Sequence, residues 1–278
     1  NLIHHLIFSP RVNLRYNPTE NINLRASYSS GFRAPQAFDE DLHVGFVGGT
    51  RLVTRLAKDL KEERSHSFSL SADLYQTIGS VQTHFLVEAF YTHLTDVFAL
   101  KALNEKDSEG NSVQERYNGS GAKVFGLNLE GKAAFTSWFQ LQAGLTLQRS
   151  LYDEPLEWDE KAPKVKKMMR TPSVYGYFTA SLTPFKNFSA SLSGNYTGKM
   201  LVGHAEHTLE NGTVVDPEAV NTPSFFVLNT KVAYDIPISN YVKLQVNGGV
   251  QNLTNAYQKD FDKGWGRDSA YILSLIHI

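Results

Sequence analysis

The sequence contains no cysteine, so it can form neither a disulfide framework nor a metal site with thiolate ligands. It also has no run approaching the roughly 18 apolar residues that a transmembrane helix needs. Neither sign of charge dominates, because 27 Lys and Arg residues are matched by 28 Asp and Glu residues. That balance gives no electrostatic reason to expect a nucleic-acid partner. These absences argue against disulfide-rich scaffolds, helical membrane proteins and nucleic-acid binders.

The dominant pattern is an alternation of apolar and polar residues, which predicts β-strands with two different faces. In the segment 22–29, Ile22, Leu24, Ala26 and Tyr28 fall on one face and polar residues fall on the other. No stretch of similar length holds a helical period as well. The mean hydropathy of −0.30 is ordinarily typical of a soluble protein. Strands of a membrane β-barrel also average to a polar composition, because lipid-facing and water-facing residues alternate.

Eleven strands are predicted, and the lengths of the connections between them also alternate. The five connections at 17–19, 78–80, 135–138, 184–186 and 237–240 are short, whereas those at 31–61, 100–113, 153–168, 201–221 and 252–267 are long. Tight turns on one rim and long loops on the other are typical of an outer-membrane barrel. Since single-chain bacterial barrels have an even number of strands, we expect an all-β, antiparallel transmembrane β-barrel of which this chain is a fragment. The predicted strands are 6–16, 20–30, 62–77, 81–99, 114–134, 139–152, 169–183, 187–200, 222–236, 241–251 and 268–274.

Four segments carry a resemblance to TonB-dependent outer-membrane receptors. “YSSGFRAP” (28–35) resembles the family's entry into an extracellular loop, and “KDLKEERSHSFSLSADL” (58–74) resembles its re-entry into the next strand. “AKVFGLNLEGKAAF” (122–135) resembles a mid-barrel strand, and “GGVQNLTNAY” (248–257) resembles a late segment of the family. Their order and spacing agree with the family from about residue 10 to residue 271, in a form similar to receptors of Bacteroidota.

The resemblance implies a 22-stranded barrel, plugged by a separate N-terminal domain, in the cell outer membrane. Such receptors import a scarce ligand, for example a ferric siderophore, cobalamin or haem, with energy relayed by TonB, ExbB and ExbD. Residues 1–272 would form the C-terminal half of the barrel, without the plug and its TonB-contacting box. Residues 273–278 depart from the family pattern, and we expect them to be a truncation artefact. The implied partners are therefore the TonB–ExbB–ExbD system, a small chelate or cofactor ligand, and outer-membrane lipid.

The segment “GFRAP” (31–35) ends a predicted strand and opens a long loop, which the resemblance makes part of the ligand mouth. Gly31 permits the backbone to turn, and Pro35 prevents the strand ladder from continuing. Two interpretations stay open for Phe32 and Arg33. They either contact the ligand directly or only shape the loop, and we favour the second.

Three histidines in long loops are further candidates for ligand contact. His43 follows “FRAP”, where haem receptors of the family carry a histidine, but the box that should come next is not kept at 57–60. An axial haem role therefore competes with that of a plain loop histidine, and no cofactor is predicted. His204 and His207 flank Glu206 closely enough to share a metal, but no third ligand is fixed nearby, so no metal site is predicted.

The acidic run “YDEPLEWDE” (152–160) holds five carboxylates and Trp158, and a basic stretch follows it. It lacks the ligand spacing of a calcium loop. We interpret the run as a solvated loop whose charges pair with one another, and Trp158 as a candidate for ligand contact.

Arg11, Arg15 and Arg25 fall on the polar faces of two adjacent predicted strands. Guanidinium groups offer paired donors to carboxylate or catecholate oxygens, so these residues can hold an anionic ligand such as a ferric siderophore. They can equally brace the plug domain through ion pairs, which is the interpretation that we favour. Arg25 is retained among the candidate ligand-binding residues.

No enzymatic activity is predicted. The serines are not set in a Gly-x-Ser-x-Gly elbow, and no His–Asp–Ser order falls at strand ends in a suggestive way. The alternative function is that of a soluble all-β carbohydrate-binding module, which would explain the aromatic content of 12%. It would not explain why an apolar face persists on every strand with nothing predicted to cover it.

Overall fold

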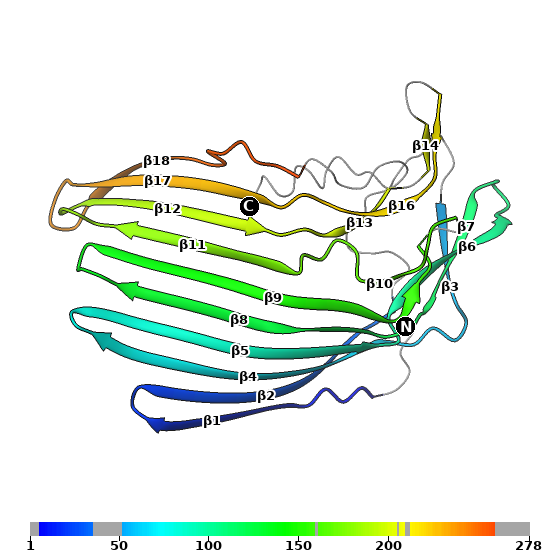
Figure 1. Ribbon diagram of the computed structural model, residues 1–278, viewed down its shortest axis with the longest axis horizontal. Coiled ribbons are helices and arrows are strands. Elements are labelled where there is room, and N and C mark those ends of the chain that lie inside the picture. Colours follow the sequence, from blue (N-terminus) through cyan, green and yellow to red (C-terminus); the bar gives the residue numbers. More distant parts are fainter. Residues whose placement is uncertain (1–5, 36–51, 159–160, 205, 209–211, 259–278) are drawn as a thin grey trace.

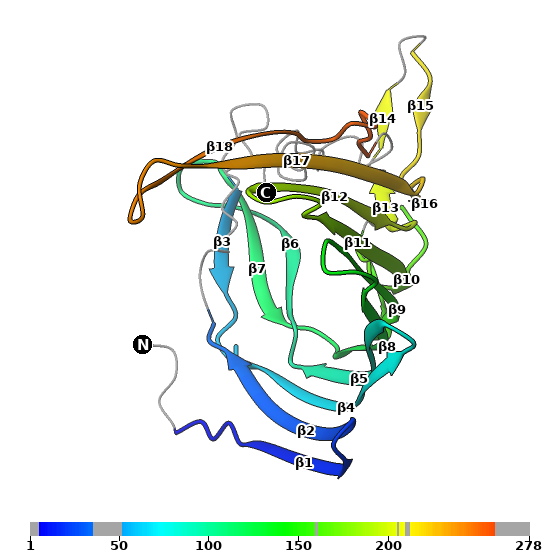
Figure 2. The same cartoon turned by 90° about the vertical axis from the view of Figure 1, so that its left-hand side faces the viewer.

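In the computed structural model, residues 6–35, 52–158, 161–204, 206–208 and 212–258 are described. One eleven-stranded antiparallel sheet dominates and curves into an open, C-shaped wall (Figures 1 and 2). None of these residues belongs to a helix long and apolar enough to cross a membrane. The wall consists, in order, of β1 (Arg11–Thr19), β2 (Ile22–Arg33), β4 (Glu63–Ile78), β5 (Val81–Thr95), β8 (Ala122–Ala134), β9 (Phe139–Leu156), β11 (Val174–Leu182), β12 (Phe188–Thr197), β17 (Phe225–Pro237) and β18 (Lys243–Val250), with β10 (Val165–Lys167) paired to β9.

The two rims of the wall differ, as the alternating connection lengths predict. Tight turns join β1 to β2, β4 to β5, β8 to β9, β11 to β12 and β17 to β18 at one end of the sheet, called the turn end below (Figure 1). The long connections and the small sheets that they form lie at the opposite end, called the loop end (Figure 1). Ten of the eleven predicted strands are thereby confirmed, with shifted boundaries, and the eleventh, 268–274, lies outside the described residues.

Two predicted strands are wrong in their extent because the alternation continues from the wall into the loops. The predicted strand 81–99 ends at Thr95, and β6 (Phe98–Lys106) follows as a separate strand. The predicted strand 114–134 is two strands, β7 (Ser112–Asn118) and β8, separated at Gly119 and Gly121. The predicted long connection at 100–113 therefore contains most of the β6–β7 hairpin.

Three small sheets occupy the loop end. β3 (Leu52–Leu56) pairs in parallel with β7, and β7 pairs with β6 in the antiparallel sense. β3 comes from the connection after β2, whereas β6 and β7 come from the connection after β5, so this sheet joins two loops. Two further pairs lie in the connection between β12 and β17. They are β13 (Leu201–His204) with β16 (Glu218–Asn221), and β14 (His207–Thr208) with β15 (Val214–Val215).

The wall has no conventional hydrophobic core. Its large apolar side chains lie on the convex outer face, where Leu70 is 63% exposed and Phe68 is 52% exposed. Among the described residues, the one cluster of buried apolar side chains lies at the loop end, where Met200 and Val202 pack with the partly buried Val220. An apolar face without a protein layer over it needs an apolar solvent, which is how a membrane barrel is built.

Candidate functional site: inner wall and loop end

The polar inner face of the wall is cross-linked between strands, and Asp73 on β4 is at the centre of one such network. Its carboxylate accepts a hydrogen bond from the guanidinium of Arg25 on β2. It also lies 2.8 Å from Nε2 of His84 on β5. The imidazole of His84 stacks on Tyr75, with ring centroids 4.4 Å apart. Arg25 is 53% exposed in its side chain, so an ion pair holds it while part of its guanidinium still faces the lumen.

Two further chains of hydrogen bonds run across the inner face from strand to strand. Asn128 on β8 donates to Glu88 on β5 at 2.9 Å and accepts from Thr146 on β9 at 2.9 Å. Nearer the turn end, Gln142 on β9 donates to Glu130 on β8 at 2.9 Å and to the hydroxyl of Tyr177 on β11 at 3.1 Å. These bonds fix the side chains of a surface that is wetted rather than packed.

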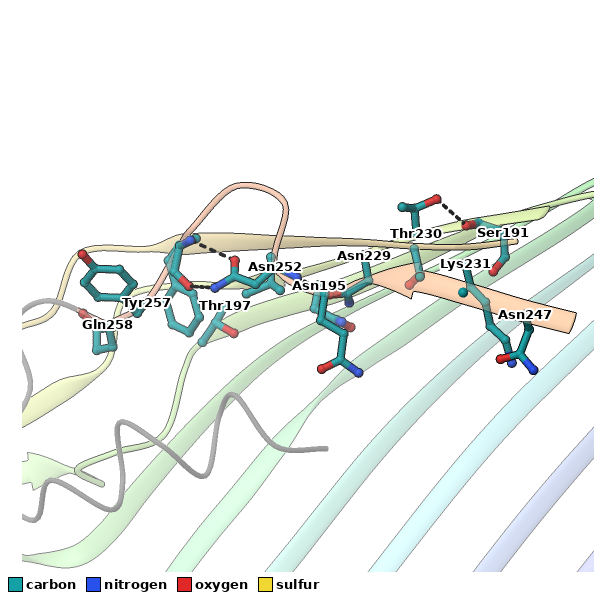
Figure 3. A pocket seen from close by; sticks show the side chains of 17 residues that line it. Ser191, Asn195, Thr197, Asn229, Thr230, Lys231, Asn247, Asn252, Tyr257 and Gln258 are labelled. Carbon is teal, nitrogen blue, oxygen red and sulfur yellow. Dashed lines mark hydrogen bonds between the residues drawn. The ribbon is translucent and has the colours of Figure 1, made fainter. Parts of the chain in front are cut away.

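A pocket of about 830 Å³ opens on the inner face of β12, β17 and β18 (Figure 3). Its lining is mixed, because the inward alternate residues of the three strands supply hydroxyl and amide groups together with the apolar side chains of Phe225 and Val227. Figure 3 shows Lys231 among hydroxyl and amide side chains. The lining includes Ser191, Ser193, Asn195, Asn229, Lys231 and Asn247. Such a surface offers many donors and one cation to an oxygen-rich guest.

The segment after β18 borders the pocket, and Asn252 folds it. The Asn252 side-chain amide donates to the carbonyl of Ala256 and its Oδ1 accepts the Ala256 N–H, at 2.8 and 2.9 Å. The backbone N–H of Asn252 donates to Asn229 Oδ1 at 2.8 Å, which ties the segment to β17. Asn252 has a φ of 53°, in the left-handed region that asparagine tolerates better than most residues. The motif “NLTNAY” thus forms one wall of the pocket.

At the loop end, Arg33 contacts an aromatic ring instead of projecting freely. Its guanidinium lies 5.8 Å from the ring centroid of Phe98 on β6, and that of Arg116 on β7 lies 5.9 Å from the same centroid. The backbone N–H of Phe98 donates to Glu63 at 3.2 Å. Phe98 therefore joins the end of β2, the start of β4 and the β6–β7 hairpin.

The predicted candidate Trp158 lies against Gly203 in β13, the residue that precedes the second candidate, His204. A Cβ at Gly203 would lie 2.8 Å from the Trp158 ring, so only glycine leaves room for the indole against β13. His204 follows and is buried, 4% exposed. The charges near Trp158 are paired: Lys164 Nζ lies 2.8 Å from Glu157, and this contact raises the pKa of Lys164.

The remaining candidates are dispersed. The alternation along β2 puts the side chain of Phe32 on the outer face of the wall, as for Tyr28, and this residue is 49% exposed. His43 lies outside the described residues, and of His207 only the backbone, in β14, is described. Arg15 lies opposite Arg25 in the β1–β2 register, and its Nε donates to Asn17 at 3.2 Å. Within the described ranges, no three His, Cys, Asp or Glu side chains are grouped so as to hold a metal ion.

Sequence reasoning missed Asp73, His84 and the pocket around Lys231. The signal for Asp73 was available, because it is the only acid on the serine-rich face of the segment 67–74. The pocket could not be predicted in this way, since it depends on how the segment after Val250 folds back beside the wall.

The curved wall, its outward apolar face and its segregated turns and loops define a transmembrane β-barrel of the outer membrane. The family model described as “TonB dependent receptor-like, beta-barrel” matches residues 4–253. The chain therefore belongs to the TonB-dependent receptor family, and neither this family nor its structural neighbours are enzymes. The soluble carbohydrate-binding alternative loses its support, because the apolar face that it left unexplained is the lipid-facing surface of the barrel.

Solved structures agree with this fold. The FrpB iron transporter from Neisseria meningitidis (F3-3 variant) is 17% identical, with a TM-score of 0.59 over 90% of this chain and 35% of its own. The ferric-catecholate import receptor Fiu from K12 E. coli is 16% identical, with a TM-score of 0.54 over 89% of this chain and 31% of its own. The transporter YddB from Escherichia coli is 13% identical, with a TM-score of 0.64 over 90% of this chain and 37% of its own. The chain thus spans about a third of the length of these structures. No curated protein sequence matches it.

Proposed function

We propose that this barrel segment belongs to a receptor for energy-coupled import of a ferric siderophore, with cobalamin or haem as less favoured ligands. The inner-wall pocket carries the proposal, since its volume of about 830 Å³ falls in the usual range for small-molecule sites and its lining combines apolar with polar side chains. Lys231 supplies a positive charge, and Arg25 keeps guanidinium donors toward the lumen. Anionic catecholate or carboxylate oxygens suit such donors. Similar structures include an iron transporter and a ferric-catecholate import receptor.

Import through this barrel would need a plug and a coupling system. We infer that a plug domain in another part of the protein closes the lumen and contacts the TonB–ExbB–ExbD system. The inner-wall side chains then have two possible partners, the plug at rest and the ligand in transit. Asp73 holds Arg25 in place by an ion pair. The exposed part of the Arg25 guanidinium can still donate hydrogen bonds to an anion in the lumen.

The test is uptake by cells whose only receptor is the intact protein that contains this chain. Iron-55 complexed by a tris-catecholate should accumulate, and it should fail to accumulate when TonB is deleted. Lys231→Ala should lower uptake several-fold, whereas Lys243→Ala, on exposed β18 near the turn end, should not. Cyanocobalamin and haemin serve as the competing ligands. If none of the three ligands accumulates in a TonB-dependent way, the proposal is wrong.

A further inference from the structure

A row of rings crosses the outer face of the wall near the loop end. Tyr28, Phe68, Tyr91 and Phe125 are successive cross-strand partners on β2, β4, β5 and β8. Ring centroids lie 4.9 Å apart for Tyr28 and Phe68, and 6.5 Å apart for Tyr91 and Phe125. Arg149 on β9 is the next member of the same row, directly opposite Phe125. Aromatic girdles mark the borders of the apolar band on outer-membrane barrels.

The length of β9 agrees with that border. A second aromatic group lies at the turn end, where Phe139 stacks on Phe135 at 5.3 Å and meets Trp138 at 6.1 Å. From Phe139 to Arg149 the strand rises by about 33 Å, or about 25 Å along the membrane normal for a tilt of about 40°. The outward residues between them are all apolar: Leu141, Ala143, Leu145 and Leu147. Arg149 therefore lies where the hydrocarbon region meets the lipid headgroups.

One row farther toward the loop end, the outer face becomes polar. His93 on β5 lies opposite Lys123 on β8, and His66 on β4 lies opposite His93. Asp153 on β9 holds two of these groups, with its carboxylate 2.8 Å from His93 Nε2 and 3.3 Å from Lys123 Nζ. Lys123 and Asp153 are each about one third exposed, at 34% and 32%. The cluster is thus ordered but open to the outside.

The charges of this cluster do not cancel. Asp153 carries one negative charge against the positive charges of Lys123 and Arg149. Arg149 is exposed and makes no ion pair within the described part of the chain. Its position is diagonal to that of Lys123 across the β8–β9 pair, which puts the two residues about 7–8 Å apart. Both long side chains can therefore reach one anion.

We propose that Arg149 and Lys123, with His93 held beside them by Asp153, bind the phosphate of a phosphorylated lipid in the outer leaflet. The guanidinium supplies paired donors to phosphate oxygens, and the ammonium adds a point charge. The apolar face that begins directly below, at Tyr91 and Leu127, would receive the acyl chains. This surface is on the outside of the barrel, so the inference does not depend on which ligand crosses the lumen.

The test is native mass spectrometry of the intact receptor in detergent, titrated with monophosphoryl lipid A or with its dephosphorylated form. The wild-type protein should retain the phosphorylated lipid at least about tenfold more strongly than the dephosphorylated one. The double variant R149Q/K123Q should lose this preference. The matched control is Lys132→Gln, a lysine on the inner face of the same strand as Lys123, which should retain it. Heat-dependent gel mobility verifies that each variant is folded.

Three results would overturn the proposal. The double variant can retain the phosphorylated lipid as well as the wild type does. The wild type can fail to distinguish the two lipids, which would mean that acyl contacts alone are responsible. Inorganic phosphate can displace the lipid at equal concentration, which would make this a free-anion site rather than a lipid site.

Discussion

The phenol ring of Tyr177 on β11 lies against the backbone of Gly144 on β9, its direct cross-strand partner. A Cβ built at Gly144 would overlap the ring, lying 3.0 Å from Cζ and 3.1 Å from Cδ1. The glycine thus lets the ring lie flat along the wall, where the Tyr177 hydroxyl accepts a hydrogen bond from Gln142. The pair shows how the inner surface is kept open. The large side chain of Tyr177 can lie along the sheet because Gly144 beside it has no side chain.

We expect Gly144→Ala to displace Tyr177 and to lower the free energy of unfolding by about 1–3 kcal/mol, the usual cost of overpacking. Gly131→Ala is the matched control on β8, because a Cβ there would lie 3.6 Å from the Phe85 ring, an ordinary contact. Urea unfolding of the intact receptor in detergent, followed by gel mobility, measures both. Equal midpoints for the two variants would contradict the close contact between Gly144 and Tyr177.

Asp73→Ala should destabilise the inner wall, because it leaves Arg25 and His84 without their shared acceptor. The carboxylate is only 3% exposed but Arg25 is 53% exposed, so water compensates part of the loss. We expect a cost of about 1–3 kcal/mol in unfolding free energy. Asp235→Ala is the control, since Asp235 accepts a side-chain hydrogen bond from the neutral amide of Gln245 and should cost less than about 1 kcal/mol.

A double-mutant cycle separates the Arg25 contact from that of His84. If Arg25→Ala costs nearly nothing once Asp73 is already alanine, the two residues act as one pair. Full additivity of the two changes would show that the ion pair contributes nothing to stability.

Phe98→Leu should loosen the two long loops, because it removes the ring that Arg33 and Arg116 share. A cation–π contact is worth about 0.5–1 kcal/mol at an exposed site such as that of Arg33 and about 2 kcal/mol when desolvated, as for the buried Arg116. We expect faster trypsin cleavage within residues 98–118 and no change in the heat resistance of the barrel. Phe98→Tyr, which retains the ring, is the control and should be cleaved at the wild-type rate.

The turn between β6 and β7 should respond to acid at an unusually low pH. The Asn111 side-chain amide, followed by the backbone N–H of Asn111, donates to Asp107 and lowers the pKa of that carboxyl below 3.8. Because the pKa is lowered in the folded state, the stabilisation is fully present above about pH 4 and is lost as the pH falls through the folded value. Hydrogen exchange of residues 98–118 should therefore be better protected in the wild type than in Asn111→Ala at pH 5 to 7, with the difference vanishing near pH 2. A difference that vanished already at pH 5 would rule out this carboxylate as the cause.

The alternating sequence pattern predicts the wall well because the period of two is a property of each strand alone. In β9, Leu145 and Leu147 face outward and Thr146 inward without reference to any other strand. The loop end was predicted poorly because its contacts join distant segments. The sequences of β3 and β7 do not indicate that these two strands pair in parallel. Likewise, no local sequence pattern predicts that Gly203 lies against the ring of Trp158.

The mixed sheet of β3, β7 and β6 has a consequence for how this receptor can change over generations. Its strands are contributed by two separate connections, so a residue inserted into β3 shifts the register against β7 and thereby the β6–β7 hairpin as well. The lengths of the two loops are thus coupled through this sheet. An insertion or deletion in one of the two loops would therefore need a matching change in the other, whereas exposed positions such as Val53 can be substituted without one.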